Sequence, residues 1–105
     1  MSVKAHIDIP HEQISAFCRK WNITEFCLFG SALRDNFRPD SDIDVLVTFA
    51  PETHYSLFDI IHAQDELKAI LGREVDLVER KAVERSENYI RRKHILSSLV
   101  PVYVA

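Results

Sequence analysis

Two aspartates that alternate along one apolar segment are the residues of this chain best suited to chemistry. Asp42 and Asp44 flank Ile43, so an extended backbone places both carboxylates on one face, opposite the apolar side chains. Carboxylates held this close repel each other unless a cation lies between them. Magnesium suits such a half-open site, because it accepts one or two carboxylates together with water and phosphate oxygens. The pair predicts a divalent-metal site, although a lone Asp-x-Asp also fits a solvated strand face.

A phosphate-binding turn is predicted upstream, at Gly30 and Ser31. The apolar run 25–29 ends at Gly30, and Ser31 can cap a short helix over residues 32–36. A glycine lets a phosphate approach the backbone, and the amides at a helix N-terminus favour the anion. No Gly-Lys-Ser/Thr sequence is present, so this is not a Walker-type loop. Taken alone, the two residues are more typical of a simple tight turn and helix cap than of a phosphate site.

A third acidic residue, Asp76, lies in a later segment with strand periodicity. Residues 74–78 alternate so that Asp76 and Glu74 share one face. If this strand is a neighbour of the first, Asp76 meets Asp42 and Asp44 across the sheet. Three such carboxylates can hold two metal ions for an in-line displacement, with Asp76 as general base as well as ligand. Glu74 is the competing candidate, and an ordinary polar sheet face is the plainer alternative.

The elements that must position these residues follow from periodicity and turn chemistry. Strands are predicted at 25–29, 42–49 and 74–78, and helices at 11–21, 55–71 and 82–98. The helix 55–71 should end at Gly72 and bury one apolar side, made of Leu57, Ile60, Ile61, Leu67, Ile70 and Leu71. Pro101 should break the chain into a short apolar tail, 102–104. The order predicts a domain that contains both helices and strands.

Composition limits the class of protein further. The chain has 105 residues, 47% of them hydrophobic and 28% charged, which predicts one globular domain over 1–105. A net charge of −3 gives no general attraction to nucleic acid, so no direct nucleic-acid partner is expected. The absence of a long apolar run predicts no membrane partner and a cytoplasmic location. Cys18 and Cys27 lack CxxC spacing and are predicted to be buried thiols.

Arginines accompany the predicted phosphate site and the last helix. Arg34 and Arg38 lie beside the Gly30-Ser31 turn, where they could neutralise developing negative charge or simply be solvated. The basic cluster 91–94 could contact a partner or a nucleotide, but a solvated face is the more common role of such a patch.

Gly30-Ser31, ten intervening residues and then Asp42-Ile43-Asp44 resemble the signature of the DNA polymerase β-like nucleotidyltransferase superfamily, and of its minimal nucleotidyltransferase (MNT) branch. The similarity extends along nearly the whole chain, from the strand before Gly30 to the basic helix. One position departs, because many relatives have Gly after the arginine matching Arg34, where this chain has Asp35. The resemblance implies an α/β (α+β) nucleotidyltransferase fold, with a small mixed sheet and helices packed mainly on one face. It also implies metal-dependent transfer of a nucleoside monophosphate from a triphosphate.

Members of this branch are commonly antitoxins encoded with a HEPN-domain ribonuclease toxin, and some transfer AMP to a tyrosine of that partner. The resemblance therefore implies a protein adenylyltransferase that uses ATP and two magnesium ions and forms a hetero-oligomer with a HEPN toxin. By the same resemblance, the triphosphate contacts are Gly30, Ser31 and Arg34, and the catalytic, metal-binding acids are Asp42, Asp44 and Asp76. The alternative is a non-catalytic antitoxin that occludes the toxin directly. Small-molecule acceptors fit less well, because relatives that use them usually carry an extra helical domain.

Overall fold

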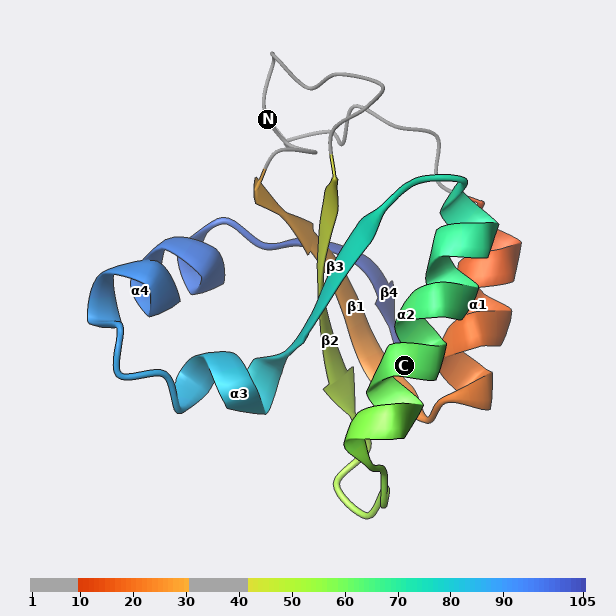
Figure 1. The fold of residues 1–105 in the computed structure, drawn as a ribbon, viewed down its shortest axis with the longest axis horizontal. Coiled ribbons are helices and arrows are strands. Elements are labelled where there is room, and N and C mark those ends of the chain that lie inside the picture. The colour runs from red at the N-terminus through yellow and green to blue at the C-terminus, as the bar shows by residue number, and fades with distance from the viewer. Residues whose placement is uncertain (1–9, 31–41) are drawn as a thin grey trace.

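The computed structural model describes residues 10–30 and 42–105, and Figure 1 shows their arrangement. Four helices and four strands are assigned within these ranges. In chain order they are α1 (His11–Lys20), β1 (Ile23–Phe29), β2 (Ile43–Phe49), α2 (Leu57–Leu71), β3 (Val75–Glu79), α3 (Arg80–Glu84), α4 (Tyr89–Ser97) and β4 (Val100–Val104). The three predicted strands and the predicted helices 11–21 and 55–71 are confirmed, with boundaries shifted by at most two residues. The predicted helix 32–36 lies outside the described residues.

The strands form one mixed sheet in the order β3-β2-β1-β4. Strand β1 pairs antiparallel with both β2 and β4, while β2 pairs parallel with β3. The parallel pair is connected by α2, because two parallel neighbours need a crossover that returns the chain to the same end of the sheet. The predicted mixed sheet with its helical connection is therefore confirmed.

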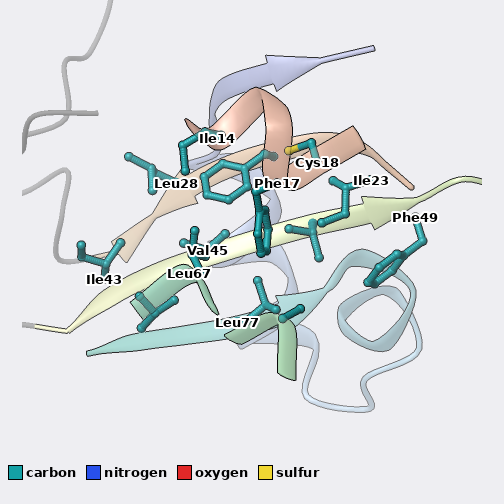
Figure 2. Close-up of a cluster of buried hydrophobic side chains, with 14 residues drawn as sticks. Ile14, Phe17, Cys18, Ile23, Leu28, Ile43, Val45, Phe49, Leu67 and Leu77 are labelled. Carbon is teal, nitrogen blue, oxygen red and sulfur yellow. The ribbon is translucent and has the colours of Figure 1, made fainter. Parts of the chain in front are cut away.

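The main core lies between one face of the sheet and the two long helices α1 and α2 (Figure 1). Helix α1 contributes Ile14, Phe17 and Cys18, and α2 contributes Ala63 and Leu67. Figure 2 shows the labelled side chains of α1 and Leu67 of α2 meeting those of β1, β2 and β3. The strand residues in this core are Ile23, Phe26, Leu28, Ile43, Val45, Val47, Phe49, Val75 and Leu77. Every second residue of β2 thus faces the helices, as the alternation predicted.

Helix α2 is fixed at both ends by its sequence. Ser56 accepts a hydrogen bond from the backbone N–H of Asp59, and Asp59 accepts one from the N–H of Ser56, which completes a capping box. Gly72 ends the helix in the left-handed conformation, as predicted. The predicted apolar side is wrong at its first turns, because Leu57 and Ile61 are 72% and 44% exposed. Of the other predicted residues, Leu67 is fully buried, and Ile60, Ile70 and Leu71 are partly buried against the main core.

The C-terminal part of the chain differs from the prediction in two ways. Residues 82–98 do not form one helix, because Asn88 accepts a hydrogen bond from the N–H of Arg91 at 3.0 Å and starts a new helix there. The apolar tail is the edge strand β4. Pro101 is tolerated because an edge strand needs hydrogen-bond donors on one side only, and the register with β1 shifts at this point.

The two short helices contact the sheet face opposite α1 and α2. Leu46, whose neighbours in β2 face the main core, packs with Val83 of α3 and Ile95 of α4. Arg80 anchors α3 to the same face, because its Nη2 lies 2.6 Å from Glu25 Oε1 and its Nε donates to Thr48 Oγ1 at 3.2 Å. The sheet is therefore covered on one face and only partly covered on the other. No helix in the described part of the chain is long and apolar enough to span a membrane.

The two cysteines give a prediction about chemical reactivity. Both are buried and free of disulfides, as predicted, and burial raises the pKa of Cys18 to about 12 and that of Cys27 to about 11. Since the thiolate is the reactive form, the folded protein at pH 8 should resist iodoacetamide, and both thiols should react in denaturant. Mass spectrometry of the alkylated protein checks this, and rapid labelling of native Cys18 would contradict the packing of α1 on the sheet.

Candidate active site

Gly30 and Asp44 meet where β1 ends and β2 begins. The antiparallel register pairs Phe29 with Asp44, so the next residue along β1 lies beside the Asp44 side chain. Gly30 has a φ of +71°, and a Cβ placed on it would overlap Asp44 Oδ2 and lie 3.1 Å from Asp44 Cγ. Glycine is required here for two reasons. Other residues disfavour a positive φ, and any residue with a Cβ would displace the Asp44 carboxylate. Gly30 and the carboxylate of Asp44 thus lie side by side.

Asp44 and Asp76 are directly paired neighbours on adjacent parallel strands. Both side chains point away from α1 and α2, because Val45 and Val75, their neighbours along the chain, are buried in the main core. Two like charges at paired positions destabilise a sheet unless an opposite charge or bound cation compensates them. The prediction that β2 and β3 are neighbours is confirmed. Gly30 at the end of β1, Asp44 on β2 and Asp76 on β3 therefore lie next to one another across the sheet.

Asp42 and Glu74 lie at the edge of this site, just before their strands begin. Both are exposed. Lys68 of α2 forms an ion pair with Glu74 at 3.0 Å, and this hydrogen bond is the largest of the effects that raise the pKa of Lys68. The charge of Asp42 raises the pKa of Lys68 as well. Glu74 is therefore engaged by Lys68 of α2, whereas Asp76 is the acid that the strand register pairs with Asp44.

The carboxylates of Asp44 and Asp76 are chemically suited to magnesium. Carboxylate oxygens from neighbouring strands, open to water and phosphate on one side, are the ligands this ion prefers. Within residues 10–30 and 42–105, no three His, Cys, Asp or Glu side chains stand close enough together to bind a single ion. The pair Asp44 and Asp76 is brought together by the sheet register, whereas the convergence of Asp42 with them remains a prediction. Ser31 and Arg34 lie outside the described residues.

Lys68 is the residue near the site that the sequence did not single out. It is one of several charged residues on an amphipathic helix, and nothing in the spacing distinguishes it from a solvated lysine. It comes close to the acids only because α2 returns the chain to the start of β3, opposite the start of β2. Contacts of this kind depend on tertiary packing.

Comparisons with known proteins agree with this geometry. The nucleotidyltransferase domain family matches residues 11–99. The chain is 37% identical over 65 residues to the protein adenylyltransferase MntA of Thermococcus cleftensis, a match that covers 62% of this chain and 64% of that relative's length. This chain belongs to the nucleotidyltransferase domain family.

Solved structures show the same fold at lower identity. A toxin-antitoxin crystal structure with AMP-PNP contains a chain that superposes with a TM-score of 0.70 and 20% identity, over 92% of this chain and 75% of that one. A complex of a tri-AMPylated HEPN toxin of Shewanella oneidensis with its MNT antitoxin superposes with a TM-score of 0.60 and 20% identity, over 90% and 70% of the two chains. The resemblance to the MNT branch is therefore confirmed at the level of the fold.

The two glycines with positive φ provide a matched test of the Gly30–Asp44 contact. Gly72 has a φ of +68°, but a Cβ there would meet nothing within 4 Å. Gly72→Ala should lower the free energy of unfolding by the roughly 1–2 kcal/mol of a strained left-handed backbone and leave Mg·ATP binding unchanged. Gly30→Ala should cost more than this and also weaken Mg·ATP binding, because Asp44 must move.

Urea unfolding and calorimetric titration of both variants measure the two effects. Equal losses of stability with unchanged nucleotide binding in Gly30→Ala would show that the close approach to Asp44 has no role in the site.

Proposed function

We propose that this protein is a magnesium-dependent adenylyltransferase that transfers AMP from ATP to a tyrosine hydroxyl of a HEPN-domain toxin, and so acts as its antitoxin. The observation that carries the proposal is the alignment of Gly30, Asp44 and Asp76 across three adjacent strands. A glycine turn without a side chain and two neighbouring carboxylates are what a triphosphate with divalent metal requires. The 64% coverage of the MntA relative makes its whole activity a proposal for this chain.

Each residue has a role that its position supports. The backbone at Gly30 and Ser31 would hold the triphosphate, with Arg34 as a further phosphate contact. Asp42, Asp44 and Asp76 would bind two magnesium ions, and charge neutralisation on the phosphate oxygens is the chemistry that these supply when bound. Asp76 would accept the proton of the acceptor hydroxyl. The hydroxyl oxygen would then form a bond to the α-phosphorus. At the same time the bond between the α-phosphorus and the oxygen that bridges it to the β-phosphate would break, and pyrophosphate would leave.

The choice of acceptor and partner rests on the relatives. MntA of Thermococcus cleftensis is named as a protein adenylyltransferase, and the Shewanella oneidensis complex holds a HEPN toxin that carries three AMP groups. The toxin-antitoxin structure with AMP-PNP supports an adenine nucleotide as the substrate. A hetero-oligomer with a HEPN toxin follows from the same complexes.

Transfer of label tests the proposal directly. The protein is incubated with magnesium, ATP labelled in its α-phosphate and the HEPN protein encoded beside it. We expect labelled HEPN protein, with the label on tyrosine by mass spectrometry and pyrophosphate released in equal amount. An unlabelled partner, under conditions where the two proteins bind each other, would contradict the transferase activity.

The third acid can be tested against its neighbour. Asp76→Asn should lower the rate of transfer by about 100- to 10,000-fold, the range for loss of a general base. Glu74→Gln is the matched control, and because Glu74 is engaged by Lys68 it should stay within a few-fold of the unaltered protein. Single-turnover kinetics measure both, and a larger loss in Glu74→Gln would transfer the role of third acid to Glu74.

Neutralisation of the toxin by occlusion alone is the competing function. Substitution of the proposed metal ligands Asp42 and Asp44 distinguishes occlusion from transfer of AMP. Asp42→Asn combined with Asp44→Asn removes the charge of both acids and keeps their size. If transfer is what neutralises the toxin, this double variant should bind the HEPN partner but fail to protect RNA from it. Full protection by the double variant would mean that binding suffices.

A further inference from the structure

A cavity of about 140 Å³ lies between α3 and α4, beside β3. Its apolar lining comes from Val78, Val83 and Ile95, and Ala82, Arg91 and Arg92 also line it. Figure 1 shows both helices on the side of β3 away from α1 and α2. The cavity is comparable in volume to a cavity of about 150 Å³ known to bind benzene, so it can admit one six-membered aromatic ring, including the six-membered ring of a purine.

The cavity lies on the same face of the sheet as Asp44 and Asp76. Val78 follows Asp76 by two residues, so it lies on the same face of the sheet, about 7 Å further along the strand. It packs with Leu46, which follows Asp44 by two residues on β2. A molecule bound at Asp44 and Asp76 can therefore extend over this face into the cavity.

The arginines of the cavity suit a flat, polar-edged ring. The Nη1 of Arg92 donates to the Ser86 carbonyl at 3.1 Å, and its guanidinium lies 5.5 Å from the Tyr89 ring centre, so its position is fixed. Arg91 lies in the first turn of α4, where its N–H donates to Asn88 Oδ1, and it is exposed. Guanidinium groups stack on aromatic faces and donate to ring nitrogens and carbonyl oxygens. An apolar cavity with these donors matches a nucleobase.

We propose that the α3–α4 cavity is the nucleobase subsite of this nucleotidyltransferase. The inference rests on the proposed function, because it assumes that the acids take a nucleoside triphosphate. The ring of an acceptor tyrosine is the other aromatic candidate, but its hydroxyl is bonded to the ring, so that ring must lie against the α-phosphate. A ribose separates a base from the α-phosphate. This spacing matches the cavity, whose residue Val78 lies two residues beyond Asp76 along β3.

Two alanines on exposed helix positions provide a matched test. Ala82→Phe fills the cavity, whereas Ala69→Phe makes the same change on α2, across the sheet. The probes are ATP and inorganic tripolyphosphate, each with magnesium, titrated by calorimetry. We expect the unaltered protein to bind ATP at least 10-fold more tightly than tripolyphosphate. Ala82→Phe should lose that 10-fold preference and keep its affinity for tripolyphosphate, and Ala69→Phe should behave as the unaltered protein.

Arg91→Ala provides a second variant that places no bulk in the cavity. It should weaken ATP binding several-fold and leave tripolyphosphate binding unchanged, whereas an equal loss for both probes would mean that Arg91 acts on phosphate and would count against the subsite. ATP affinity that is unchanged in both Ala82→Phe and Arg91→Ala overturns the base subsite alone. Failure of the unaltered protein to bind either probe overturns the proposed function together with it.

Discussion

The arrangement of the site depends on one constraint, the close packing of the Gly30 backbone against the Asp44 carboxylate. It exists because β1 runs antiparallel to β2, so that the end of one strand lies beside the beginning of the next. The parallel pairing of β2 with β3 then brings Asp76 to the same level as Asp44. A turn and two acids from three distant parts of the chain are thereby collected at one end of the sheet.

Stability and chemistry are divided between the two faces of the sheet. The face covered by α1 and α2 holds most of the buried apolar side chains, and α1 is tied to α2 by Glu66, which accepts hydrogen bonds from Trp21 at 2.8 Å and Lys20 at 3.1 Å. Partial burial raises the pKa of Glu66, but the hydrogen bonds from Trp21 and Lys20, together with the charge of Lys20, outweigh it and lower the pKa overall. The other face has a smaller core around Leu46, which leaves its acidic end open. Most of the buried apolar packing therefore lies on one face of the sheet, and the acids Asp44 and Asp76 lie on the other.

Much of this could be predicted from the sequence, because the decisive signals are local. Alternation around Asp42 and Asp44 predicts a strand with one acidic face, and the apolar period of residues 55–71 predicts the helix that connects two parallel strands. Strand β4 was missed because Pro101 normally excludes a strand, and only its place at the sheet edge makes it acceptable. The division at Asn88, the ion pair of Lys68 and the α3–α4 cavity arise from packing between distant segments, which periodicity cannot reveal.

The central claim is that the paired carboxylates of β2 and β3 bind a divalent cation beside the Gly30 turn. Paramagnetic broadening of amide resonances by Mn²⁺, with a non-hydrolysable ATP analogue bound, measures this most directly. The account predicts that the amides of Gly30, Asp44 and Asp76 broaden first and together, at low metal concentration. Broadening centred instead on Glu74 and the end of α2, with Gly30 and Asp44 unaffected, would contradict it.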